Sequence, residues 1–221
     1  MTKIIAFEGI DGTGKSVQMA NLADRLTRRG KGVKEISFPI YTSFFGKEVG
    51  NLLSGKDGIR ADSVNGKSMA LWFALDRFEA FRSFRYDDAD FLLINRYVLS
   101  NAVYQSIRDC DLGHEDLLDF VLALEYEHFG IPKADVHLVL DMNIEDAAQN
   151  VDKKGFRDYV GNEKDVYEAL PALQNRARKK YMDYAGRMHN IRIVPCMEGN
   201  KLKSIASIGN LIDETLQDII Q

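Results

Sequence analysis

The sequence is poor in the residues that mark secreted, metal-binding and membrane-spanning proteins. Only two of its 221 residues are cysteines, Cys110 and Cys196, and neither lies in a CxxC pair or near a cluster of histidines. This excludes a disulfide scaffold and predicts two unreactive thiols in a reducing compartment. No apolar run approaches the roughly 20 residues that span a bilayer, and the N-terminus turns glycine-rich too early for a signal peptide. We therefore expect a cytoplasmic protein that does not bind membranes.

An excess of charge of one sign is also lacking. The formal net charge is -4, from 29 basic and 33 acidic residues. This balance argues against binding to nucleic acid through overall charge, although it allows a local basic patch for phosphates. There are only four prolines and no repeat or low-complexity linker, and 45% of the residues are hydrophobic. We expect a single domain over residues 1–221 with one sizeable core.

Short apolar runs alternate with longer amphipathic stretches along the chain. The expected strands are 3–8, 33–38, 90–95, 136–141 and 191–195, and the expected helices are 16–29, 71–85, 115–129, 176–188 and 202–220. This alternation predicts an α/β fold in which helices cover both faces of a parallel sheet, a three-layer sandwich. Glu8, Asn95 and Asp141 each end an apolar strand, so we expect all three to border one cleft at the carboxyl edge.

The stretch 149–168 differs from its surroundings because it carries charges of both signs and little apolar content. One interpretation is an exposed loop or a solvated pair of helices. The other is a mobile lid that brings Lys153, Lys154 or Arg157 over bound phosphates. The sequence leaves both open.

Residues 9–16, GIDGTGKS, match the phosphate-loop pattern GxxxxGK[ST] in full. The motif follows an apolar strand at once and opens a helical pattern, as a P-loop NTPase-type fold requires. The residues of this motif that we expect to bind the nucleotide are Gly9, Asp11, Gly12, Thr13, Gly14, Lys15 and Ser16. Glycines let backbone N–H groups curl around a phosphate, the lysine adds positive charge at the β- and γ-phosphates, and the serine offers its hydroxyl to Mg²⁺. The motif predicts ATP binding with Mg²⁺.

Five segments in order along the chain belong together. The first is EGIDGTGKS at residues 8–16, and the next are Phe38-Pro39 with Tyr41, and Trp72-Phe73 before Leu75-Asp76-Arg77. NRYVLSNAVYQ at 95–105 and DVYE at 165–168 follow. In this order they resemble the thymidylate kinases, a family of P-loop nucleoside monophosphate kinases. The most specific is the segment 95–105, which is similar to the family's D-R-Y-x-x-S-x-x-A-Y-Q, and 165–168 resembles the end of its lid. The resemblance implies transfer of the ATP γ-phosphate to thymidylate by a homodimer.

The same resemblance implies roles for individual residues. The acceptor nucleotide would contact Asp11, Phe38, Tyr41, Phe73, Arg77, Arg96, Ser100, Asn101, Tyr104 and Gln105. Phe73 would stack on thymine, an aromatic face on a planar base, and Arg77 and Gln105 would reach its polar edge. Ser100 and Asn101 would complete the base pocket.

The remaining roles concern the sugar and the phosphates. Asp11 would meet the sugar 3′-hydroxyl and Tyr104 would crowd the 2′ position. Arg96 would hold the acceptor phosphate through its planar donor fork. The catalytic residues would be Lys15, Arg96 and Arg157, and the Mg²⁺ ligands would be Ser16 and Asn95.

The sequence departs from the family pattern at several positions. Asn95 stands where the family has an aspartate, and Ile40 where many relatives have an arginine. Gly12 leaves the phosphate loop without an arginine, and Asn150 and Val166 stand where relatives often carry lid arginines. Two alternatives therefore stay open: a kinase for another deoxynucleoside or pyrimidine monophosphate, and a catalytically weak nucleotide-binding regulatory protein.

Overall fold

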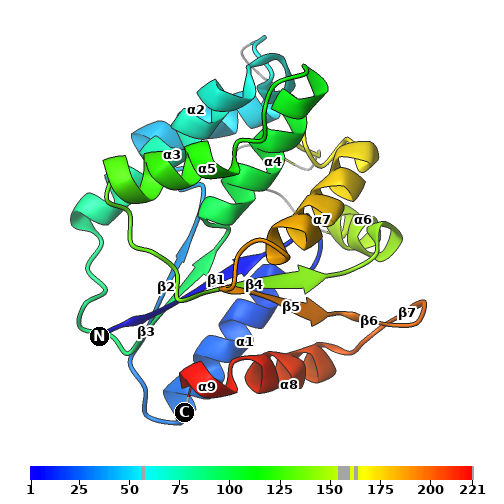
Figure 1. Ribbon diagram of the computed structural model, residues 1–221. Coiled ribbons are helices and arrows are strands. Elements are labelled where there is room, and N and C mark those ends of the chain that lie inside the picture. Colours follow the sequence, from blue (N-terminus) through cyan, green and yellow to red (C-terminus); the bar gives the residue numbers. More distant parts are fainter. Residues whose placement is uncertain (56–57, 154–159, 162–163, 221) are drawn as a thin grey trace.

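A parallel β-sheet lies at the centre of the molecule, between two layers of helices (Figure 1). The computed structural model describes residues 1–55, 58–153, 160–161 and 164–220. The strands are β1 (Lys3–Glu8), β2 (Val33–Ser37), β3 (Phe91–Asn95), β4 (Val136–Asp141) and β5 (Ile191–Pro195). They pair in the order β2-β3-β1-β4-β5, and every pair is parallel. A small antiparallel pair, β6 (Met197–Glu198) and β7 (Lys201–Leu202), follows the sheet. The predicted parallel sheet is confirmed.

Helices cover both faces of the sheet (Figure 1). One face carries α1 (Lys15–Arg28), α8 (Ile205–Thr215) and α9 (Gln217–Ile220). The other carries α2 (Phe44–Ser54), α3 (Gly66–Ser83), α4 (Val98–Asp111), α5 (Leu118–Leu122) with η2 (Ala123–His128), and α7 (Pro171–Ala185). The 3-10 turn η1 (Ala61–Ser63) precedes α3, and α6 (Ile144–Asp152) follows β4. Within the described residues, no helix has both the length and the apolar content needed to cross a membrane.

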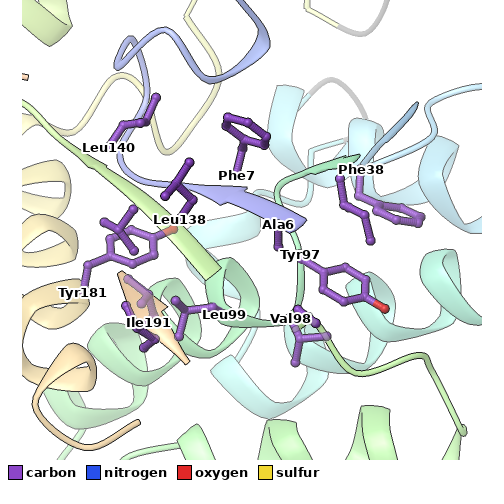
Figure 2. Packing of buried hydrophobic residues seen from close by; sticks show 14 of the residues in the cluster. Ala6, Phe7, Phe38, Tyr97, Val98, Leu99, Leu138, Leu140, Tyr181 and Ile191 are labelled. Atoms are coloured by element: carbon purple, nitrogen blue, oxygen red, sulfur yellow. The ribbon is translucent and has the colours of Figure 1, made fainter. Parts of the chain in front are cut away.

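The central strands are buried on both faces, as the near-continuous apolar runs predict. Ile5 and Ala6 of β1 and Leu92 and Leu93 of β3 have no exposed surface. Figure 2 shows how β1 and β4 contribute to this core together with side chains from the helices. The core fixes the strand ends, and those ends carry the functional loops.

Local signals explain why two helices begin earlier than predicted. The Asn65 side chain caps α3 by accepting a hydrogen bond from the Ser68 N–H at 2.8 Å, so this helix starts at 66 rather than 71. Pro171 occupies the first turn of α7, where its fixed φ is favourable, so that helix starts at 171 rather than 176.

Other helix predictions need correction. The expected helix 115–129 is a short α-helix, α5, that continues into the π-helical segment η2. The expected helix 202–220 begins only at Ile205, after β7, and is divided into α8 and α9. Two helices, α2 and α4, are present where the sequence analysis predicted none, and the end of α6 overlaps the stretch 149–168, for which a solvated pair of helices was one interpretation.

The two cysteines are separate in the structure, as the sequence predicts. Cys110 is exposed on α4, whereas Cys196 is buried and follows β5. Burial raises the pKa of the Cys196 thiol to about 12, with a further contribution from the charge of Asp141. This thiol is therefore protonated and unreactive at neutral pH.

Candidate active site

The phosphate loop joins β1 to α1 and holds a lysine ammonium inside its curve. Gly9, Gly12 and Gly14 have φ values of 129°, 84° and 82°, which only glycine adopts easily. The Lys15 ammonium donates hydrogen bonds to the carbonyls of Gly9 at 3.1 Å and Ile10 at 2.7 Å. Backbone N–H groups of the loop and the start of α1 lie beside this fixed cation, an arrangement that suits a phosphate.

Gly12 is also the point where α6 approaches the loop most closely. A Cβ atom at this position would lie 1.9 Å from the carbonyl oxygen of Ala147. The Asn150 side-chain amide donates a hydrogen bond to the Gly12 carbonyl at 2.9 Å. Position 12 therefore admits no side chain while α6 stays in place, which explains why this loop carries no arginine there.

We expect Gly12→Ala to lower the free energy of unfolding more than an ordinary glycine substitution at positive φ. The backbone conformation alone costs about 1–2 kcal/mol, and displacing α6 adds about 1–3 kcal/mol. Gly30→Ala is the matched control, because Gly30 has φ 79° but open space around its Cβ position. Urea unfolding of both variants checks this, and equal losses of stability would contradict the role of α6.

A cavity of about 390 Å³ opens beside the phosphate loop, at the carboxyl edge of the sheet. Twelve of the residues predicted from the sequence line it: Asp11, Ser16, Phe38, Tyr41, Phe73, Arg77, Asn95, Arg96, Ser100, Asn101, Tyr104 and Gln105. They come from the phosphate loop, from the loops after β2 and β3, and from α3 and α4. Of the predicted catalytic residues, Arg157 lies outside the described residues, as does Lys154, while Lys153 is exposed at the end of α6.

Two side chains of α4 that line this cavity, Asn101 and Gln105, each carry one amide atom without a partner. The Asn101 Oδ1 and Gln105 Nε2 atoms are buried and have no hydrogen-bond partner within the part of the chain that the structure describes. Buried polar groups are normally paired, so an unpaired acceptor and an unpaired donor in one cavity indicate a polar ligand. A planar ligand edge with one donor and one acceptor would satisfy both.

Arg77 lies at the same end of the cavity and is held by a buried carboxylate. Its Nε and Nη2 atoms donate to the two Glu125 oxygens at 2.5 and 2.7 Å, and both side chains are almost fully buried. Burial lowers the pKa of the Arg77 guanidinium, but the charge and hydrogen bonds of Glu125 outweigh this and raise it. Glu125 lies in the π-helical segment η2, a distortion that often occurs at functional sites.

Arg96 has an unusual backbone conformation at the end of β3. Its φ is 61°, rare for a residue other than glycine, and its N–H donates to the Phe7 carbonyl at 3.0 Å. The guanidinium forms an ion pair with Asp11 and lies 5.6 Å from the centre of the Tyr104 ring. Burial alone lowers the pKa of Arg96, but the charge of Asp11 and the neighbouring hydroxyls hold it well above its usual range. Strained conformations of this kind persist where the surrounding structure fixes them, often at active sites.

The part of the cavity wall around Asp11 and Tyr104 is cross-linked by residues far apart in the sequence. Tyr104 stacks on Tyr167 with ring centres 5.6 Å apart, and its hydroxyl donates to the Gln174 Oε1 at 3.0 Å. Gln174 also accepts from the Asp11 N–H at 3.1 Å and donates to the Asp11 carboxylate at 3.1 Å. The sequence analysis missed Gln174, which carries no motif.

The prediction that Glu8, Asn95 and Asp141 border one cleft is wrong for two of the three. Only Asn95 lines the cavity. Glu8 is fully buried and accepts hydrogen bonds from the Tyr97 N–H at 3.1 Å and from the Ser100 hydroxyl. Burial raises the pKa of Glu8, but His137 and Ser100 outweigh this and lower it. Asp141 pairs with Arg178 at 2.5 Å, outside this cavity.

Ser16 and Asn95 form a small oxygen-rich corner next to the phosphate loop. The Asn95 amide donates to the Ser16 hydroxyl oxygen at 3.3 Å. Its own oxygen, Oδ1, is buried and, among the described residues, has no partner. A hydroxyl and an unsatisfied amide oxygen are ligands that Mg²⁺ accepts, and Mg²⁺ commonly uses few protein ligands and adds substrate phosphates and waters. The donor set at this corner therefore fits a magnesium ion.

The chain is similar to known proteins along most of its length. A sequence-family model described as Thymidylate kinase matches residues 7–198. The chain is 30% identical over 187 residues to a thymidylate kinase of Mycobacterium tuberculosis, covering 83% of this chain and 86% of that protein. It is 33% identical over 189 residues to a probable thymidylate kinase of Methanococcus aeolicus, covering 83% and 79%. Its fold matches that of thymidylate kinase from Candida albicans with a TM-score of 0.72 at 21% identity, over 100% of this chain and 94% of that one.

Proposed function

The chain belongs to the thymidylate kinase family of phosphotransferases, and from this premise we propose that it transfers the γ-phosphoryl group of ATP to thymidylate. The observation that carries the acceptor assignment is the pair of unsatisfied amide atoms, Asn101 Oδ1 and Gln105 Nε2, on two residues that line the cavity. Thymine presents an N3–H donor beside an O4 acceptor, so its edge satisfies both atoms at once. Phe73, which also lines the cavity, would supply the aromatic face on which the ring stacks.

In the proposed reaction the protein mainly aligns the two nucleotides and neutralises the charge on the migrating phosphoryl group. The acceptor phosphate is already an anion, so no strong general base is required. Arg96 would hold that phosphate, and Lys15 would neutralise charge on the migrating phosphoryl group. Mg²⁺, when bound by Ser16 and Asn95, would supply further positive charge at the donor phosphates. We assign Arg157 the part of a lid cation, and closure of the lid over both nucleotides would exclude water.

We extend the proposal to the sugar, the cellular location and the assembly. Asp11 would meet the sugar 3′-hydroxyl, and Tyr104 would crowd the 2′ position and favour a deoxyribose. Both side chains line the cavity, and Arg96 contacts both. A homodimer in the cytoplasm, with ATP and thymidylate as its ligands, stays a prediction that the family resemblance implies.

A coupled assay of ADP release across all nucleoside monophosphates and deoxynucleosides tests the function. We expect the highest kcat/KM with thymidylate and little release with the free nucleosides. A higher kcat/KM with another monophosphate would assign a different acceptor. Tight ATP binding without ADP release for any acceptor would instead favour a regulatory nucleotide-binding protein.

We expect Asn95→Asp to raise turnover and to lower the Mg²⁺ concentration needed for the half-maximal rate. A carboxylate attracts Mg²⁺ more strongly than a neutral amide does. The expected gain is several-fold, on the order of 1 kcal/mol. Titration of Mg²⁺ at saturating ATP and thymidylate measures it, with Asn175→Asp on the exposed side of α7 as the control for the added charge. A slower variant with an unchanged Mg²⁺ requirement would show that Asn95 does not contact the metal.

A further inference from the structure

We infer that Glu125 and Arg108 set the base specificity of this enzyme by fixing which end of two pocket amides faces the ligand. The inference rests on the proposed function and concerns how the same site distinguishes bases. Neither residue lines the cavity, so each acts as a positioning residue through a neighbour that does. Glu125 acts through Asn101, and Arg108 acts through Gln105.

The Asn101 amide has only one orientation that its surroundings allow. Its nitrogen donates to the Glu125 Oε1 at 2.9 Å and to the Ala70 carbonyl at 3.0 Å. Both partners are acceptors, and the Glu125 side chain also accepts two hydrogen bonds from Arg77. A rotated amide would point its oxygen at these two oxygens. Asn101 therefore presents an acceptor, Oδ1, to the cavity.

The Gln105 amide is fixed in the opposite sense by donors. Its oxygen accepts from the Arg108 Nη1 at 3.0 Å and from the Tyr167 hydroxyl at 3.2 Å. Arg108 also donates to the same Tyr167 hydroxyl at 3.0 Å, so the tyrosine proton is directed towards Gln105. An arginine has no acceptor, so the amide nitrogen cannot replace the oxygen there. Gln105 therefore presents a donor, Nε2, to the cavity.

An acceptor beside a donor distinguishes the two kinds of pyrimidine edge. Thymine and uracil offer N3–H and O4, which complement both amides, whereas cytosine offers N3 and an N4 amino group, which oppose both. If the amides turned freely, both would adapt to either edge, and only the fixed Arg77 guanidinium at the same end of the cavity would still favour the thymine edge. A site whose buried polar groups are left unpaired by the wrong ligand discriminates strongly, and a free amide flip would weaken that discrimination.

The sharpest probe pair is thymidylate and 5-methyldeoxycytidine monophosphate, which share the methyl group, sugar and phosphate and differ only in the edge that the amides face. For the unmodified enzyme we expect kcat/KM to favour thymidylate by at least about a hundredfold. Arg108→Glu replaces a hydrogen-bond donor with an acceptor. The Gln105 amide then turns its nitrogen towards the new carboxylate and its oxygen towards the ligand. The preference should then fall by about tenfold or more, because one of two hydrogen bonds now suits the cytosine edge.

Glu125→Gln tests the other amide. The new side-chain amide can donate to Asn101, so only the Ala70 carbonyl still opposes a rotated Asn101 amide, and the preference should again fall, by up to about tenfold. The matched controls are Glu127→Gln, two residues away and exposed, and Arg28→Glu on the exposed face of α1. Both should keep the unmodified preference. Arg108→Lys keeps a cationic donor and should restore most of the preference lost in Arg108→Glu.

Calorimetry of the same variants gives the ratio of dissociation constants for the two nucleotides. This second readout does not depend on turnover. Melting curves show whether Glu125→Gln, which weakens the pairing with Arg77, stays folded; if it unfolds, the Arg108 variants decide. Unchanged ratios in folded Arg108→Glu would overturn the inference, as would an unmodified enzyme that binds both nucleotides equally. No transfer to thymidylate by the unmodified enzyme would overturn the proposed function instead, and the binding ratios would still decide the inference.

Discussion

Replacement of Lys15 by alanine is expected to reduce phosphoryl transfer by at least about two to three orders of magnitude. The Lys15 ammonium is buried inside the phosphate loop, where it is hydrogen-bonded to the Gly9 and Ile10 carbonyls. A fixed cation in a cleft that excludes water stabilises developing phosphate charge far better than solvent does, and it needs no reorganisation during the reaction. The loss should therefore appear in kcat as well as in ATP binding.

The design of this test must separate charge from packing. Lys15→Met keeps most of the aliphatic stem and removes the charge, so it should be as inactive as Lys15→Ala while unfolding at a similar temperature to the unmodified enzyme. Lys179→Ala, on the exposed side of α7, removes an equal charge from the surface and should leave kcat unchanged. Near-normal turnover in Lys15→Met would refute the assignment of the phosphate loop.

The sequence predicts the sheet more accurately than the helices, and burial explains the difference. Strands β1 and β4 have the predicted bounds because a parallel strand buried on both faces is a short apolar run with sharp ends. The edge strand β5 also has the predicted bounds, although it is only partly buried, and Pro195 is its last residue. Helix α4 was missed because nearly all of its residues are buried, including Asn101, Tyr104 and Gln105. Its apolar residues do follow the helical period, but polar side chains such as Asn101 and Gln105 interrupt the buried stripe by which a helix is usually recognised.

Helix α2 was not predicted for a different reason. Its buried side includes Gly46 and Gly50, which add nothing to a hydrophobic pattern. A Cβ on Gly46 would lie 2.0 Å from the Ile40 carbonyl, so the glycine is required by close backbone approach rather than by helix formation. A single sequence does not distinguish this need from a glycine in a loop.

The motif residues of the site were predicted, but the residues that position them were not. Glu125, Gln174 and Arg108 are polar side chains inside helical segments. From the sequence alone, each of them resembles an exposed polar residue on the solvated face of a helix. The rule about strand ends failed for Glu8 because it places the end of a strand but not the face to which the last side chain points. Glu8 turns into the core towards Ser100 and His137.

The second large effect is expected for Arg96→Ala, which should raise the KM for thymidylate and lower kcat far more than it changes ATP binding. Losing a hydrogen bond to a charged group costs about 1.5–3 kcal/mol, a factor of about ten to a hundred. The ion pair with Asp11 holds the guanidinium over Tyr104 at the cavity wall before any nucleotide binds, so the arginine is already oriented. A pre-oriented group loses little entropy when it binds a phosphate.

Two comparisons make this last result interpretable. Arg96→Lys keeps the charge but not the planar fork, so it should recover only part of the activity. Arg178→Ala breaks another arginine–aspartate pair, with Asp141 at the same edge of the sheet but outside the cavity, and should leave the KM for thymidylate unchanged. Asp11 keeps its hydrogen bonds to Gln174 when Arg96 is removed, so the phosphate loop should hold its shape and ATP should still bind. Equal losses of affinity for ATP and thymidylate would place Arg96 at the phosphate loop rather than at the acceptor.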